Sequence, residues 1–207
     1  KSFLLGKLFL KTKSTLNGVP AKFIVSSKTK NDTFNIAYVS ASYYNNGISF
    51  WIKDDENVEK AKKIDCITIV DHANAGVCFY QNDYFVCSPD SSVVLIKNNK
   101  LKCLLDNNRF CYLFICKMIE MSLRNRAHGW EKMTAAKRSR SIADDFDREL
   151  ILLPVIACSE SEAIWHDDDG TPITLDVDKI SYLLSEAKKA REEKAKEQSE
   201  AQKKLLN

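Results

Sequence analysis

The stretch SASYYNNG, from Ser40 to Gly47, concentrates hydrogen-bonding side chains around a turn signal. Asn and Gly tolerate a positive φ angle, so NNG predicts a tight turn between two strands. Tyr43 and Tyr44 add two flat rings to the serine hydroxyls and asparagine amides. We expect this stretch to be both a turn and a recognition edge. The alternative is a plain hairpin with one of the tyrosines packed inward.

Charged side chains are distributed unevenly in the second half of the chain. Residues 117–140 contain seven Lys or Arg and two Glu, whereas residues 141–178 contain eleven acids and one Arg. A basic cluster beside an acidic segment is typical of a surface that binds a polyanion. Two solvated surfaces would have the same composition, so the charge pattern alone leaves both interpretations open.

The seven cysteines contain no CxxC pair, and most of them lie inside apolar runs. This pattern predicts reduced cysteines that pack as small hydrophobic residues, without a disulfide framework, metal site or cofactor. A cytoplasmic location is the corresponding expectation. An enzyme that uses Cys78 or Cys87 as a nucleophile beside His72 is an alternative, but an apolar strand disfavours a thiolate.

Short apolar and β-branched runs recur through the first 100 residues, separated by Asn, Asp, Gly and Ser clusters. They predict a β-rich domain whose strands contain KFIVSS, NIAYVSAS, GISFWI, DCITIVD, GVCFYQ, YFVCS and SVVLIK. The runs DCITIVD and GVCFYQ are almost continuously apolar. We therefore expect these two strands to be covered on both faces.

From about Asn107 the apolar spacing changes to three and four residues, which predicts a helix over 107–127 with Asn107 or Asn108 as its N-cap. Its predicted buried stripe is Phe110, Leu113, Phe114, Met118 and Met121. A short helix is expected near IADDFDREL, residues 142–150. A strand in LILLPVI should then end near Pro154.

The segment after Asp178 contains no Gly or Pro and is rich in Ala, Glu and Lys, so it predicts one long helix. The expected fold class is α+β, with a β-rich domain over 1–178 and a helical segment over 179–207. Such a long helix needs a partner for its apolar seam unless it is a solvated terminus. The predicted dimerisation seam is Ile180, Leu183, Leu184, Ala187, Ala190 and Leu205.

The order of three segments resembles a known family. SASYYNNGISFWI is followed by CITIVDHANAGVCFYQNDYFVCSPDSSVVLI, then by the predicted helix, HGWEK and ILLPV. This order is similar to the target-recognition domain of type I restriction–modification specificity subunits, including the BcgI-like branch. The matching positions are Asn45, Asn46, Gly47, Ile48, Thr68, Ile69, Gly76, Val77, Phe79, Tyr80, Gln81, Phe85, Ser88, Gly129, Lys132, Ile151, Leu153 and Pro154.

The resemblance implies a non-catalytic reader of double-stranded DNA that recruits adenine methyltransferase subunits and, in the full complex, a restriction subunit. Basic side chains would neutralise phosphates, and short polar side chains would read base edges. The predicted DNA contacts are Ser42, Tyr43, Tyr44, Asn45, Asn46, His72, Asn74, Arg124, Arg126, His128, Trp130, Lys132, Lys137, Arg138 and Arg140. Arg124 and Arg126 would alternatively neutralise the end of the preceding helix.

Other functions remain open at this point. The chain could be the C-terminal recognition domain of a fused methyltransferase–nuclease, or a non-enzymatic protein-interaction module with a basic surface. Its helix could pair with a second copy to read a divided, palindromic site, or it could dock on a methyltransferase subunit. No methyltransferase or nuclease motif is visible, so neither activity is assigned to this chain, and no cofactor or membrane partner is expected.

Overall fold

The computed structural model describes residues 1–15, 24–71, 75–127 and 146–205 of the chain, with only the backbone described at 124–127 and 203–205. It divides into two compact units, residues 1–153 and 154–207. This division reflects how the residues pack and carries no information on function. The functional boundary expected at residue 178 therefore stays a prediction.

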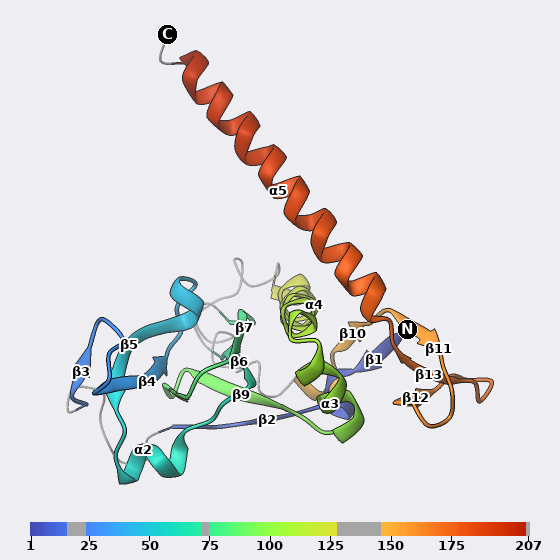
Figure 1. The fold of residues 1–207 in the computed structure, drawn as a ribbon, viewed down its shortest axis with the longest axis horizontal. Helices are drawn as coiled ribbons and strands as arrows, with labels where there is room; N and C mark the ends of the chain where they lie inside the picture. Colours follow the sequence, from blue (N-terminus) through green and yellow to red (C-terminus); the bar gives the residue numbers. More distant parts are fainter. Residues whose placement is uncertain (16–23, 72–74, 128–145, 206–207) are drawn as a thin grey trace. The chain divides into compact units, whose positions relative to one another are not determined.

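One sheet of the first unit joins four strands in antiparallel fashion (Figure 1). In order across the sheet they are β2 (Phe9–Thr12), β9 (Ser91–Ile96), β6 (Cys66–Val70) and β7 (Cys78–Gln81). Ile67, Ile69, Val93 and Val94 are almost completely buried. Because neighbouring residues of a strand face opposite sides, burial at both 93 and 94 means that β9 is covered on both faces.

A second sheet carries the hairpin that contains the NNG turn. Its strands are β3 (Ser26–Ser27), β5 (Ile48–Lys53), β4 (Phe34–Val39) and β8 (Phe85–Cys87). The β4–β8 pair is parallel, and the other two pairs are antiparallel. Ile36 and Tyr38 pack on one face of β4, and Ala37 and Val39 pack on the other. Six of the seven predicted strand runs of the first 100 residues are confirmed. In KFIVSS only Ser26–Ser27 form a strand, and Lys22 and Phe23 lie outside the described residues.

Helices and two short strands complete the first unit. They are β1 (Ser2–Leu4), α1 (Leu5–Leu8), α2 (Glu56–Ala61), α3 (Asn99–Asn107), α4 (Phe110–Ala127), the short 3-10 helix η5 (Phe146–Arg148) and β10 (Leu150–Leu152). The sequence interpretation missed α2 and α3, although Asp55 and Asn98 cap them through their side chains. Around Pro154 the predicted strand is interrupted, because β10 ends at Leu152 and the next strand starts at Val155.

Helix α4 confirms the predicted helix but corrects its start and its buried face. It begins at Phe110, because Asn107 is the last residue of α3 and Asn108 caps the end of α3. Leu113 and Met121 of the predicted stripe are 56% and 45% exposed. The buried residues of α4 are instead Cys111, Tyr112, Ile115, Cys116, Ile119 and Leu123. The helix is apolar on nearly every side over its first two turns, so both stripes fit the 3.6-residue period. Packing against β7 and β10 then selects the face that contains Tyr112 and Ile115.

The second unit consists of a three-stranded antiparallel sheet and a long helix. The elements are β11 (Val155–Ala157), β13 (Pro172–Leu175), β12 (Trp165–His166) and α5 (Val177–Leu205). Asp176 accepts a hydrogen bond from the Lys179 amide at 2.8 Å, which caps the first turn of α5. The α+β class and the long C-terminal helix are confirmed. In the described part of the chain, no helix is long and apolar enough to cross a membrane.

A buried carboxylate ties three strands of the first sheet together. Asp71, which follows β6, is 2% exposed and lies 2.5 Å from the ammonium groups of both Lys11 and Lys13. The Ser92 hydroxyl of β9 donates a further hydrogen bond to Asp71 at 2.5 Å. Burial alone would raise the pKa of Asp71, but these contacts outweigh it and hold the pKa below its ordinary value.

We expect Asp71→Asn to lower the free energy of unfolding by about 2–4 kcal/mol at neutral pH, because the Lys11 ammonium loses its buried counter-charge. A carboxylate with a depressed pKa stabilises the fold above about pH 4, and that contribution disappears as the pH falls through the folded-state pKa. Urea unfolding between about pH 2 and 7 measures both effects. An acid dependence as steep in Asp71→Asn as in the unsubstituted chain would contradict this assignment.

Candidate nucleic-acid interface

The predicted turn is present, and its backbone is left-handed at three successive residues. The φ angles of Asn45, Asn46 and Gly47 are 50°, 54° and 78°. A Cβ atom at Gly47 would lie 3.1 Å from the Phe79 ring and 3.2 Å from the Val39 side chain. Glycine is therefore required at position 47 by both its φ angle and its surroundings. Asn is the residue that best tolerates such angles besides glycine, which explains the two asparagines.

The Asn46 side chain anchors this turn to strand β7. Its amide nitrogen donates to the Tyr80 carbonyl at 3.0 Å and to the Gln81 side-chain oxygen at 3.1 Å. In return the Gln81 amide donates to the Asn46 carbonyl at 2.8 Å and to the Thr68 hydroxyl at 3.1 Å. Gln81 and Thr68 are both buried. The turn is thus fixed to β6 and β7 by a closed set of side-chain hydrogen bonds.

The two tyrosines of the stretch point away from this anchor. Tyr44 is 82% exposed and Tyr43 is 44% exposed, so neither ring is packed into the core. The Ser42 hydroxyl accepts a hydrogen bond from the Tyr44 amide at 3.1 Å, and the Asn45 amide donates to the Ile48 carbonyl at 3.2 Å. Ser42, Asn45 and Asn46 therefore shape the turn, and the tyrosines are the large side chains that it exposes beside the two asparagines.

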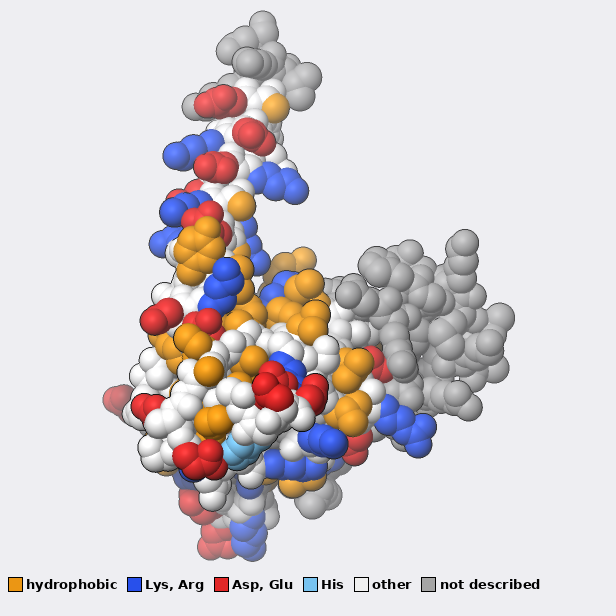
Figure 2. Space-filling model, turned by 90° about the vertical axis from the view of Figure 1, so that its right-hand side faces the viewer, with side chains coloured by type: hydrophobic (Ala, Val, Ile, Leu, Met, Phe, Trp, Pro, Cys, Tyr) orange, Lys and Arg blue, Asp and Glu red, His pale blue; other side chains and the backbone are white. Residues whose placement is uncertain are grey.

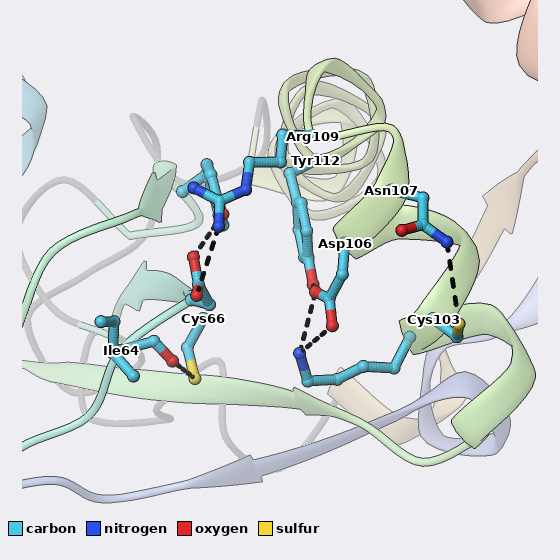
Figure 3. A network of polar contacts seen from close by, with 10 residues as sticks. Ile64, Cys66, Cys103, Asp106, Asn107, Arg109 and Tyr112 are labelled. Atoms are coloured by element: carbon cyan, nitrogen blue, oxygen red, sulfur yellow. Dashed lines mark hydrogen bonds and ion pairs between the residues drawn. The ribbon is translucent and has the colours of Figure 1, made fainter.

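Strand β7 also connects the turn to helix α4. The rings of Tyr80 and Tyr112 stack with their centroids 4.2 Å apart and an interplanar angle of 8°. The Tyr80 hydroxyl donates to Asp65 at 2.7 Å, and Asp65 lies 3.7 Å from the Arg109 guanidinium. In Figure 3 the Arg109 side chain extends from the start of α4 toward the segment that carries Cys66. This aromatic and ionic contact holds α4 against the sheet that supports the turn.

A second carboxylate completes the network. Tyr112 donates to Asp106 of α3 at 2.8 Å, and Lys102 donates to the same carboxylate at 2.8 and 2.9 Å (Figure 3). Burial and the hydrogen bond to Asp106 raise the pKa of Tyr112, so its hydroxyl stays a donor at neutral pH. Burial opposes ionisation of Asp106, but the contacts with Lys102 and Tyr112 hold its pKa below the ordinary value.

Sequence reasoning named Thr68, Tyr80 and Gln81 only as positions that match the family, and it did not predict that they form a network. The residues of this network are Asp65, Thr68, Tyr80, Gln81, Asp106, Arg109 and Tyr112. The position of Gln81 could have indicated such a network. A Gln at the end of an almost continuous apolar strand is expected to be buried and to need hydrogen-bond partners. The pairing of Tyr80 with Tyr112 joins positions far apart in the sequence, so no local pattern predicts it.

Several predicted contact residues lie outside the described part of the chain. They are His72, Asn74, His128, Trp130, Lys132, Lys137, Arg138 and Arg140. Arg124 and Arg126 belong to the last turns of α4, where the backbone alone is described. The structure therefore brings Ser42, Tyr43, Tyr44, Asn45 and Asn46 together in one turn, and the basic contacts stay predictions.

The cysteines considered as nucleophiles are packed inside the sheets. Cys87 is 1% exposed, and burial raises the pKa of its thiol to about 12. Burial likewise raises the pKa of the Cys78 thiol well above its ordinary value. A thiol with such a pKa carries almost no thiolate at neutral pH, so neither side chain is suited to nucleophilic attack.

Helix α5 displays the predicted seam only in part. Ile180 is completely buried within the chain, and Leu184 is half-buried. Leu183, Ala187 and Ala190 are exposed, and the side chain of Leu205 lies outside the description. Figure 2 shows acidic and basic side chains interspersed along α5, with few hydrophobic ones on that face. Pairing of this helix therefore stays a prediction.

No family model matches the sequence, and no curated protein matches it. Among solved structures, the chain is similar to the crystal structure of a type I restriction–modification system S subunit from M. genitalium. The sequence identity is 12% and the TM-score is 0.48, over 94% of this chain and 41% of that chain. This chain thus spans less than half of the S subunit's length.

Replacing Asn46 tests the anchor of the turn. We expect Asn46→Ala to lower the free energy of unfolding by about 2–4 kcal/mol, because Ala is strained at a φ of 54° and the buried side-chain oxygen of Gln81 loses its hydrogen-bond donor. Asn46→Gly is the matched control, since it removes the same hydrogen bonds without the backbone strain and should lose less. Urea unfolding measures both variants, and equal losses would argue against the strain at this position.

Proposed function

We propose that this chain is a sequence-specific, double-stranded DNA-recognition component of a restriction–modification system. It carries no catalytic group for the reaction and directs an adenine methyltransferase, and a restriction subunit in the full complex, to their site. The observation that carries the proposal is the turn at Asn45–Gly47, which presents two exposed tyrosines from a rigid base. The sequence order that resembles specificity subunits of the BcgI-like branch supports it independently.

The proposed contacts divide into two chemical classes. Tyr43 and Tyr44 supply rings and hydroxyl groups that reach the base edges, while Ser42 and the asparagines hold those rings in place and add hydrogen-bonding groups. Lys132, Lys137, Arg138 and Arg140, with the arginines near the end of α4, would neutralise phosphates. The link from β7 to α4 through Tyr80 and Tyr112 supports this division, because it joins the turn to the helix that leads into the basic segment.

Helix α5 would set the position of the reading domain. In this proposal residues 179–207 pair antiparallel with the same helix of a second copy, so that two domains read a divided, palindromic site in the cytoplasm. The same helix would alternatively dock on the methyltransferase, either as a separate subunit or within a fused methyltransferase–nuclease. No membrane or cofactor has a part in this function.

A protein-interaction module is the second candidate function. It is favoured by the outward face of α4, where Phe110, Leu113 and Met121 are at least one-third exposed. An apolar helix face open to solvent commonly marks a protein contact. Salt dependence separates the two candidates, because the logarithm of DNA affinity falls linearly with the logarithm of salt concentration for a protein that neutralises phosphates.

Selection from a pool of random duplexes tests the proposed function. The chain should enrich one short sequence, and its affinity for that duplex should fall steeply with salt. Tyr44→Ala should then weaken binding by about 1–3 kcal/mol, because one contact to the groove is lost, without changing the unfolding midpoint. Fluorescence anisotropy measures the affinities.

Tyr84→Ala is the control for that experiment, because Tyr84 is an exposed tyrosine outside the turn and lies under the Lys62 ammonium. It should bind the selected duplex as the unsubstituted chain does. A pool that shows no enrichment, or equal effects of the Tyr44 and Tyr84 substitutions, would refute the assignment of the turn.

Removing the chain after Asp178 tests the role of α5. We expect the solution mass, measured by light scattering, to fall from that of a dimer to that of a monomer. Leu183→Glu in the intact chain should have the same effect through the exposed seam, whereas Ser181→Glu, also on an exposed position, should not. An oligomeric state unchanged by the truncation would exclude pairing through α5.

A further inference from the structure

A cavity of about 290 Å³ lies beside α2, within the first unit. It is lined by Lys13, Ser14, Thr15, Asn57, Lys60, Ala61 and Lys63. These residues carry three ammonium groups, two hydroxyl groups and one side-chain amide. None of these described lining residues is acidic, so the cavity has a positive wall and no carboxylate of its own.

The spacing of residues along α2 explains this separation of charge. Asn57, Lys60 and Ala61 are three and four residues apart, so they share one face of the helix. Of the acids near α2, Asp54 and Glu59 form ion pairs with Lys62, and the Asp55 side chain caps the start of the helix. Glu56 forms no ion pair among the described residues. This arrangement leaves Lys60 and Lys63 without an ion-pair partner among the described residues.

The backbone around the cavity is fixed by long-range hydrogen bonds. Lys63 exchanges two backbone hydrogen bonds with Phe85 of β8, each 2.9 Å long. The buried Ser14 hydroxyl donates to the Ala61 carbonyl at 2.5 Å, and the Ser14 carbonyl accepts from the Cys87 amide at 2.7 Å. Both sides of the cavity are therefore attached by backbone hydrogen bonds to strand β8.

Lys13 contributes to the wall but is not a free cation. Its ammonium group donates to Asp71, to the Pro89 carbonyl at 2.8 Å and to the Ser91 carbonyl at 3.1 Å. These contacts use all three of its donors, and Asp71 shares its single negative charge between Lys13 and Lys11. The charge available to a ligand is thus that of Lys60 and Lys63.

We propose that this cavity is a binding site for a phosphate group. A phosphate monoester carries close to two negative charges at neutral pH and offers three acceptor oxygens. Two unpaired ammonium groups match that charge, and the Asn57 amide on the same helix face supplies a further donor. A carboxylate would leave one ammonium unpaired, and a neutral ligand would leave both.

The site shares no residue with the turn at Asn45–Gly47, so it does not depend on the proposed reading function. The phosphate could come from a small phosphorylated molecule or from a nucleic-acid backbone. Both sources offer the same oxygens to Lys60 and Lys63. The pH dependence differs between them, because only a monoester gains its second charge as the pH rises through about 6.

Calorimetric titration with glycerol phosphate, and separately with a short mixed-sequence duplex, tests the site in the full chain. Lys60→Gln with Lys63→Gln should weaken binding of the monoester about tenfold or more, since two charge-assisted contacts are lost. Lys28→Gln with Lys53→Gln removes the same charge from exposed positions elsewhere and should leave that binding unchanged. Monoester binding to the unsubstituted chain should tighten as the pH rises through about 6.

The Lys60 and Lys63 variant could lose affinity for the duplex alone, and lose more of it than the control variant does. That result identifies a nucleic-acid backbone as the source of the phosphate. Equal behaviour of the two double variants toward both probes overturns the proposal. Thermal melts of both variants confirm that the substitutions leave the fold intact. If the duplex does not bind at all, the proposed reading function fails, and the monoester titration still decides the phosphate site.

Discussion

The arrangement of the first unit depends on one buried side-chain amide. Gln81 has little access to water, so each hydrogen bond that its amide does not make inside the protein costs about 1–3 kcal/mol. Thr68 and the Asn46 backbone and side chain supply the partners. The turn cannot move away from β7 without leaving the Gln81 side-chain oxygen and one of its N–H groups unpaired. A polar group in the core therefore fixes the position of an exposed loop.

The neighbouring residue extends the same constraint to the helices. Successive side chains of a strand face opposite sides, so Gln81 meets the turn and Tyr80 meets α4. Asp65 and Arg109 reinforce this contact, and Asp106 joins α3 to it through the Tyr112 hydroxyl. One short strand thus positions a turn on one side and a pair of helices on the other.

Local patterns predicted most of the strands, the NNG turn and α5, because each depends on neighbouring residues. They could not choose the buried face of α4, where a run from Phe110 to Cys116 is apolar on every side and only the shape of the sheet decides. They also could not predict the partners of Gln81 or Tyr80, which come from distant segments. Helices α2 and α3 could have been predicted from the sequence, because Asp55 and Asn98 are residue types that commonly cap helices.

Different residues of the turn anchor it and form its exposed surface. Asn46 and Gly47 hold the turn through an amide and through backbone geometry, whereas the rings at positions 43 and 44 make no part of that anchor. Exchanging Tyr44, whose side chain is 82% exposed, would alter the outer surface and leave the scaffold unchanged. Variants with new side chains there can therefore arise without a loss of stability. The binding preference of this loop can thus change while the fold is kept.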